Sequence, residues 1–286
     1  MYGAIEAGGT KMIVAVGGDD GKVLRTKEIK TGTPKETVPK MLDFFKNEDI
    51  EAIGIGAFGP VCLEENGDDY GRIEKSPKLP WVGFSWKEAF EEMKVPVVVD
   101  TDVNAACIGE AVYGNGRGLK DVIYITIGTG IGVGVYSEGR LLHGMLHPEA
   151  GHILLSKREG DDFSGCCPYH KNCFEGLASG PAIKMRYGTE AFNLLERKEV
   201  WDLEAEYIGK ALMQYILCYS PRRIILGGGV MHVEKLFPLI REKTKEYLNS
   251  YINTAGLSDM DNYIVPAALC GEQGIRGALF LARNAR

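Results

Sequence analysis

The chain contains the same pattern of strands and turns twice, and this repeat constrains its fold more than any other feature. Residues 4–16 read AIEAGGTKMIVAV, two apolar runs joined by a Gly/Thr turn, and residues 124–142, YITIGTGIGVGVYSEGRLL, follow the same plan about 120 residues later. Both copies have the pattern of a β-hairpin with glycine-containing turns. Repetition of a whole supersecondary unit predicts a duplicated α/β fold, two similar domains around a cleft.

The remaining segments alternate between apolar strands and helical spacing, as α/β architecture requires. Strands are expected at residues 53–55, 95–99, 223–226 and 263–265, and helices at 36–46, 105–113, 204–219, 233–251 and 274–283. We expect Pro39 to interrupt the first helix and residues 66–86 to form loops. Gly114, Gly116 and Gly118 mark a hinge between domains 1–118 and 119–286. The last helix is a candidate for packing back on the first domain.

Composition excludes several classes of protein. A chain of 286 residues exceeds the usual size of a single core, which favours two domains. Its net charge of −6 and lack of clustered Lys and Arg argue against a nucleic-acid partner. No apolar run approaches the roughly 20 residues of a membrane helix. The seven cysteines are an odd number and are scattered apart from a cluster at 166–173, and no signal peptide is found at Met1, so we expect a cytoplasmic, reduced protein.

A cluster of soft metal ligands lies in the second half of the chain. His152, Cys167, His170 and Cys173 have the spacing H-x14-C-x2-H-x2-C, whose two short gaps allow one loop to wrap an ion. Two thiolates and two imidazoles are typical of zinc, and four protein ligands predict a closed structural site. Cys166 is a spare thiol that could substitute as ligand.

Three glycine-rich turns each follow an apolar strand. They are Gly8-Gly9-Thr10-Lys11, Gly128-Thr129-Gly130 and Gly227-Gly228-Gly229. Glycine lets backbone N–H groups encircle an anion and Thr adds a donor, so such turns suit phosphates, although any one of them could simply make a tight hairpin. Three in one chain favour a bound nucleotide. No P-loop motif occurs, and the G-x-G-x-x-G match at 54–59 runs into Pro60 rather than a helix, so we interpret it as coincidence.

Asp102 lies where a predicted strand ends and a predicted helix begins. Strand-end carboxylates lie at the ligand-binding edge of an open α/β sheet, and one there can accept the proton of a hydroxyl that attacks a γ-phosphate. The alternative role is a helix N-cap, which Asp often fills, but Asp100 or Asn104 could serve that end instead.

Glu149 and Glu175 flank the metal ligands, and His152 could bind zinc through one ring nitrogen while the other points outward. Carboxylates and an oriented N–H are groups that hold sugar hydroxyls, and metal binding would preorganise the donor. For the carboxylates alone, a solvated surface is the other interpretation. The three remaining histidines, His143, His147 and His232, have no comparable setting, so we expect them to be structural or exposed.

Taken together, these residues resemble the ROK family of sugar kinases and sugar-responsive repressors, within the actin-like ATPase superfamily. The resemblance covers essentially the whole chain. It rests on IEAGGTK at 5–11, GIGAFGPV at 54–61, TDVNAA at 101–106, ITIGTGIGVG at 125–134, HPEAGH at 147–152, CPYHKNCFEGLASGPA at 167–182 and ILGGGV at 225–230.

The resemblance implies two actin-like (ribonuclease H-like) domains with ATP and Mg²⁺ between them, and transfer of the γ-phosphoryl group to a hexose. Asp102 would be the catalytic base. The implied sugar contacts are Asn104, Glu149, His152, Glu175, Thr101 and the loop at Gly59. The implied phosphate contacts are Gly8, Gly9, Thr10, Lys11, Gly128, Thr129 and Gly130, and the adenosine side would be held by Pro181, Gly227, Gly228, Gly229, Val230 and Met231. Many relatives are dimers, which predicts a homodimer.

Three departures from the common family pattern resemble the fructokinase branch: Glu6 in place of Asp, Thr101 in place of Asn, and CPYHxxC in place of a three-cysteine segment. The expected activity is therefore ATP-dependent phosphorylation of fructose at its 6-position. Alternatives are a kinase for mannose, glucose or an N-acetylhexosamine, and a sugar-sensing regulator. The regulator reading is disfavoured because only Met1 to Ala4 precede the first strand, where a DNA-binding motif is expected.

Overall fold

The computed structural model describes residues 1–64, 67–74 and 78–285; residues 66 and 75–77 of the expected loop region therefore lie outside the described part. The chain forms two compact units. The first comprises Met1–Gly118, Leu141–Pro148 and Ala268–Arg286, and the second comprises Leu119–Arg140 and Glu149–Ala267.

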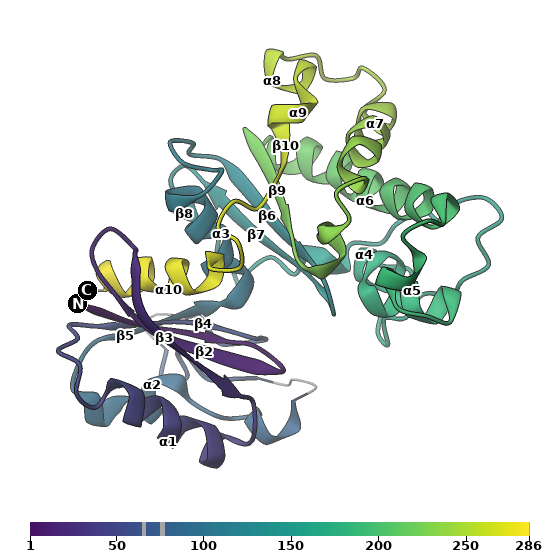
Figure 1. Ribbon diagram of the computed structural model, residues 1–286. Coiled ribbons are helices and arrows are strands. Elements are labelled where there is room, and N and C mark those ends of the chain that lie inside the picture. Colours follow the sequence, from purple (N-terminus) through teal and green to yellow (C-terminus); the bar gives the residue numbers. More distant parts are fainter. Residues whose placement is uncertain (65–66, 75–77, 286) are drawn as a thin grey trace. The chain divides into compact units, whose positions relative to one another are not determined.

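The helices and strands are named in chain order (Figure 1). They are β1 (Tyr2–Ala7), β2 (Lys11–Gly17), β3 (Val23–Lys30), α1 (Pro34–Phe45), β4 (Ile53–Ala57), η1 (Leu79–Trp81), α2 (Trp86–Ala89), η2 (Glu91–Met93), β5 (Val97–Thr101), α3 (Asp102–Tyr113), β6 (Val122–Ile127), β7 (Ile131–Ser137), β8 (Arg140–Leu141), η3 (Ala150–His152), α4 (Phe174–Ala178), α5 (Gly180–Tyr187), η4 (Ala191–Leu194), α6 (Lys198–Tyr219), β9 (Arg223–Gly227), η5 (Gly229–His232), α7 (Leu236–Leu248), α8 (Ala255–Ser258), α9 (Met260–Tyr263), β10 (Ile264–Pro266) and α10 (Gln273–Arg283).

Two mixed sheets have the same plan, which confirms the duplicated α/β fold. The first has the order β3-β2-β1-β4-β5 and the second β8-β7-β6-β9-β10. In the first sheet the hairpin pair β1 and β2 is antiparallel, while β4 and β5 join parallel to β1. In the second, β6 and β7 are antiparallel and β9 and β10 follow parallel to β6. The carboxyl ends of three parallel strands therefore meet at one edge of each sheet.

The first sheet is covered on both faces because its side chains alternate between two cores. On β1, Ile5 and Ala7 face the larger core, whose other members include Phe45, Trp81 and the remaining aromatic side chains near α1 and α2. Ala4, which precedes Ile5 on β1 and faces the other side, contacts the smaller core that α10 covers. Figure 1 shows α1 and α2 on one side of this sheet and α10 with α3 on the other.

The α10 face is built by backbone-to-backbone contact. A Cβ added at Gly54 on β4 would lie 1.9 Å from the carbonyl oxygen of Ala278, and one added at Gly277 would lie 1.7 Å from that of Ala105 on α3. Only glycine fits at such contacts. These glycines thus allow α10 to lie directly on β4 and α3.

The carboxylate of Glu110 holds two connecting segments of the first unit. Its side chain, at the end of α3, is fully buried. One oxygen accepts the backbone N–H groups of Ala268 and Leu269 at 2.8 and 3.0 Å, and the other accepts that of Asn115 at 2.9 Å. A buried carboxylate needs such donors, and here they come from the segment after α3 and the segment before α10. The side chain therefore fixes both segments to the same helix.

In the second unit, α6 packs against α7, and α4 packs against α6 (Figure 1). The buried face of α6 includes Trp201, Tyr207, Leu212 and Tyr215. None of the helices in the described part of the chain combines the length and apolar character of a membrane span.

The expected helix at 233–251 is shorter in the structure, as α7, and two other expectations about helices were wrong. Pro39 does not interrupt α1, which runs from Pro34 to Phe45. Pro39 and Lys35 both lie on the exposed face of this helix, so water can bond the Lys35 carbonyl that lacks an N–H partner. The helix α6 begins at Lys198 rather than at residue 204, because its first turn buries Val200 and Trp201.

We predict that Gly54→Ala lowers the free energy of unfolding by about 1–3 kcal/mol, because the new methyl group overlaps the backbone of α10. Urea unfolding followed by circular dichroism measures the change. The matched control is Gly256→Ala in α8, where the nearest atom to an added Cβ is 4.0 Å away. Equal effects of the two substitutions would contradict the close-packing account.

Candidate functional site

The predicted site residues of the first unit follow the carboxyl ends of three adjacent parallel strands. The turn Gly8–Lys11 follows β1, the Gly59-Pro60 segment follows β4, and Asp102 follows β5. The strand register, with Ala7 beside Ala57 and Ala57 beside Thr101, brings these ends to the same edge. This edge is where open α/β sheets bind ligands.

Asp102 is the first residue of α3, but it is not the helix cap. The cap is Thr101, whose hydroxyl accepts the N–H of Asn104 at 3.1 Å. One carboxylate oxygen of Asp102 accepts the N–H of Val103 at 2.8 Å, which fixes the side chain. The capping role that an Asp at this position often fills thus belongs to its neighbour.

Glu6 on β1 lies close enough to Asp102 for the two carboxylates to interact. Burial, together with the negative charge of Asp102, raises the pKa of Glu6 from 4.5 to about 7, although Lys11 and a hydrogen bond from the backbone of Ile275 act in the opposite direction. Its Oε2 is buried with no hydrogen-bond partner. A hard dication beside the carboxylates would relieve this situation, so the residues present fit Mg²⁺.

The first glycine turn is bordered by an ammonium group that the sequence did not indicate. Lys11, the expected cation of the turn, forms an ion pair with Glu28 of β3 at 2.7 Å. Lys78 instead donates to the carbonyl of Gly9 at 2.9 Å, and a Cβ added at Gly9 would meet its Nζ at 2.4 Å. A second positive charge next to the turn, in addition to that of Lys11, therefore comes from a residue about 70 positions away in sequence.

A polar cluster lies beside the start of α3. The Asn104 amide donates to Asp100 Oδ1 at 2.7 Å, and the ring of His143 contacts Asp100 Oδ2 through Nε2 at 2.9 Å. His143 is exposed, as expected, but it also contacts this cluster, because residues 141–148 belong to the first unit. Buried His147 lies against Gly59, whose bond to Pro60 is cis.

In the second unit, the turn Gly128–Gly130 follows β6 and is contacted by two later segments. Glu175 Oε2 accepts the N–H of Ile131 at 3.0 Å, and a Cβ added at Gly130 would meet the same oxygen at 2.7 Å. The N–H of Gly180, at the start of α5, donates to the carbonyl of Gly128 at 2.8 Å. The predicted residue Pro181 follows this contact and is exposed.

The third glycine turn follows β9 at the same edge of the second sheet. Gly228 has φ +89°, and its backbone lies so close to Ile127 at the end of β6 that an added Cβ would be 2.4 Å from that carbonyl oxygen. The 3₁₀ helix η5 then carries Gly229, Val230 and Met231. The second and third turns are thus neighbours.

The four predicted metal ligands converge. Their donor atoms all lie within 4.8 Å of one another. Nδ1 of His152 is 3.8 Å from the Cys167 sulfur and 3.5 Å from the Cys173 sulfur, and Nδ1 of His170 is 3.9 Å from the Cys167 sulfur. Zn–S bonds of about 2.3 Å and Zn–N bonds of about 2.05 Å at a tetrahedral angle separate neighbouring donors by about 3.6 Å. The donor set and its spacing therefore fit one zinc ion.

Cys166 points away from this cluster. Its sulfur lies 3.5 Å from the Ser179 hydroxyl and 3.8 Å from the Glu175 carbonyl oxygen.

Burial raises the pKa of the Cys173 thiol to about 12, so a cation is needed to stabilise a thiolate there.

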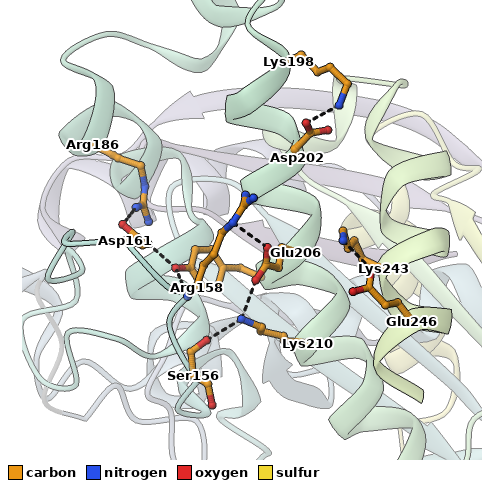
Figure 2. A network of polar contacts seen from close by, with 11 residues as sticks. Ser156, Arg158, Asp161, Arg186, Lys198, Asp202, Glu206, Lys210, Lys243 and Glu246 are labelled. Atoms are coloured by element: carbon orange, nitrogen blue, oxygen red, sulfur yellow. Dashed lines mark hydrogen bonds and ion pairs between the residues drawn. The ribbon is translucent and has the colours of Figure 1, made fainter. Parts of the chain in front are cut away.

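The segment between His152 and Cys167 is fixed to α6 by a polar network (Figure 2). Lys210 bridges the carbonyl of Ser156 at 3.0 Å and Glu206 at 2.9 Å. Asp161 pairs with Arg186 and accepts the Tyr207 hydroxyl. Burial acts to raise the pKa of Asp161, but these hydrogen bonds prevail and lower it. These contacts therefore fix the segment between His152 and Cys167 against α6.

Glu149 is exposed at the start of η3, and its carbonyl accepts the N–H of His152 at 3.0 Å. Because His152 directs Nδ1 to the cysteines, Nε2 lies on the opposite side of the ring. Each half of the predicted site is thus assembled within its unit.

Lys78 and His143 were missed because no local motif marks a lone Lys or His that long-range contacts bring to a site.

The comparisons with known proteins agree with this geometry. The ROK family pattern matches residues 2–285. Fructokinases of Pediococcus pentosaceus and Streptococcus mutans are 42% and 39% identical to this chain, over 100% and 99% of it and 98% of each relative. The crystal structure of a ROK family glucokinase from Streptomyces griseus in complex with glucose and AMPPNP superimposes with a TM-score of 0.78 at 27% identity, over 99% of both chains.

The fold is therefore that of the actin-like sugar kinases. The chain belongs to the ROK family.

We predict that Glu6→Gln alters the pH dependence of stability. The folded chain binds the Glu6 proton more tightly than the unfolded chain, since the pKa is about 7 rather than 4.5. The stabilisation is complete below the lower value and is lost as pH rises through the higher one. In magnesium-free buffer, Tm of the unmodified protein should fall relative to that of Glu6→Gln between about pH 5 and pH 8. Parallel curves would contradict the assigned shift.

Proposed function

We propose that this chain is an ATP-dependent hexose kinase that converts fructose into fructose 6-phosphate. The observation that carries the proposal is the Asp102 carboxylate at the end of β5, relieved of helix capping by Thr101 and accompanied by Glu6. Full-length similarity to two fructokinases supports fructose as substrate, and the glucose and AMPPNP named for the Streptomyces structure support a hexose and an adenine nucleotide.

Asp102 is the proposed base. Its carboxylate accepts the proton of the sugar hydroxyl as the oxygen attacks the γ-phosphorus of ATP. The backbone N–H groups of the turns Gly8–Lys11 and Gly128–Gly130 bind phosphate oxygens, and Gly227–Met231 with Pro181 bind the adenosine side. Glu6 would hold Mg²⁺ and its waters, and the ion would supply charge neutralisation for the phosphates when bound. Lys78 adds a positive charge beside the first turn.

Three of the proposed sugar-binding side chains lie in or beside the metal loop, which is the segment from His152 to Cys173. Glu149 and Glu175 accept hydrogen bonds from sugar hydroxyls, and His152 donates one from the nitrogen that does not face the cysteines. Thr101, Asn104 and Gly59 belong to the sugar half of the first unit. His152, Cys167, His170 and Cys173 would bind a structural Zn²⁺, which holds the loop in place and takes no part in the transfer. A cytoplasmic homodimer stays a prediction.

A coupled assay of ADP release with fructose, mannose, glucose and N-acetylhexosamines tests the substrate. We expect the highest kcat/KM for fructose, and Asp102→Asn should lower kcat by roughly 10²- to 10⁴-fold, because the variant cannot accept the proton. A preference for another hexose would correct the substrate. Absence of turnover on every hexose, or full activity of Asp102→Asn, would refute the kinase proposal.

The zinc proposal predicts one zinc ion per chain. Cys173→Ser should lose the metal because it removes a donor whose sulfur lies 3.5 Å from His152, whereas Cys166→Ser should retain it because that sulfur points to Ser179. Metal content is measured by mass spectrometry of the purified proteins. Equal zinc content in the two variants would rule out the assigned ligand set.

A further inference from the structure

His143 is oriented by a carboxylate beside the start of α3. Its Nε2 lies 2.9 Å from Asp100 Oδ2. A carboxylate only accepts hydrogen bonds, so we assign the ring proton to Nε2, which makes the imidazole a donor toward Asp100. The same Nε2 lies 3.4 Å from the amide nitrogen of Asn104, a packing contact because both nitrogens carry protons in this tautomer. The hydrogen bond to the buried Asp100 therefore sets the position of the ring.

The side chain that orients His143 is itself fixed. Asp100 lies on β5, where its exposed fraction is 4%. Its Oδ1 accepts the N–H of Thr101 and the amide of Asn104, both at 2.7 Å, so each oxygen has a partner. Such a carboxylate has little freedom to rotate. The carboxylate therefore holds the imidazole at a fixed position relative to β5.

Two of the side chains expected to contact the sugar, both at the start of α3, are buried. Thr101 is 2% exposed and its hydroxyl caps the helix, while Asn104 is fully buried. The side chain of His143 is 38% exposed. It is thus the polar group of this cluster that a ligand can touch, and it stands beside the helical turn that carries Asp102.

We propose that His143 is a specificity-determining residue whose Nδ1 accepts a hydrogen bond from a hydroxyl group of the hexose, with Asp100 as the residue that positions it. This inference rests on the proposed kinase function. An imidazole fixed in one tautomer discriminates among hexoses because a hydroxyl in another configuration cannot reach the same bond. A hexose whose hydroxyl cannot reach the imidazole leaves it without a hydrogen-bond partner in the bound state, and that hexose therefore binds more weakly.

The test is steady-state kinetics of His143→Ala and His143→Gln on the hexose panel. We expect KM for the preferred hexose to rise about 10- to 100-fold in His143→Ala, with a much smaller change in kcat, in KM for ATP and in KM for the poorer hexoses. His143→Gln, which retains a donor and an acceptor, should recover part of the loss. Met145→Ala is the matched control, since that side chain lies in the same segment and is 96% exposed.

A loss of selectivity without a loss of Tm supports the proposal, because a merely structural role would impair all hexoses alike. Unchanged KM and unchanged preference in both variants would overturn it, as would an equal fall in kcat/KM for every hexose. If His143→Ala is unfolded, the Gln variant and Asp100→Asn give the same comparison. Absence of hexose turnover in the unmodified protein would instead overturn the proposed function and this assignment together.

Discussion

In the second unit, the hydrogen bond from the Ile131 N–H to Glu175 joins the glycine turn to α4. Cys173 is the N-cap of α4, its sulfur accepts the N–H of Gly176 at 3.3 Å, and Glu175 lies in the first turn of that helix. A proposed metal ligand and the carboxylate are therefore two residues apart on one helical turn. Fixing the sulfur fixes Glu175, and Glu175 in turn fixes the end of the glycine turn at β7.

The first unit positions its proposed site residues through different contacts. Its parallel strands end at one edge, and α10 supports that sheet through glycine contacts that leave no room for side chains, as at Gly54 and Gly277. Glu110 ties α10's leading segment to α3, the helix that begins with Asp102. The proposed base is thus carried by an element that is held on several sides, as catalytic positioning requires.

Much of this arrangement could be predicted from the sequence because it is local. The repeated hairpins, the strand ends and the short gaps between Cys167, His170 and Cys173 each depend on a few consecutive residues. Spacing alone left Cys166 open as a ligand, and only the direction of its sulfur toward Ser179 distinguishes it from Cys167.

The remaining features depend on long-range packing. The raised pKa of Glu6 results from burial and from Asp102, about 100 residues later. The setting of His143 exists because residues 141–148 belong to the first unit, and no periodic pattern in the sequence marks such a return. Lys78 likewise reaches the Gly9 carbonyl across a distance in sequence that no motif spans.

The central proposal is that zinc bound by Cys167, His170, Cys173 and His152 holds Glu149, His152 and Glu175 in place to bind fructose. It is tested most directly by adding zinc in steps to chelator-treated protein while the rate of fructose phosphorylation is measured. The account predicts a rate that rises in proportion to bound zinc and reaches its maximum at one ion per chain, with KM for fructose restored alongside. Full activity and a normal KM for fructose in the zinc-free protein would contradict it.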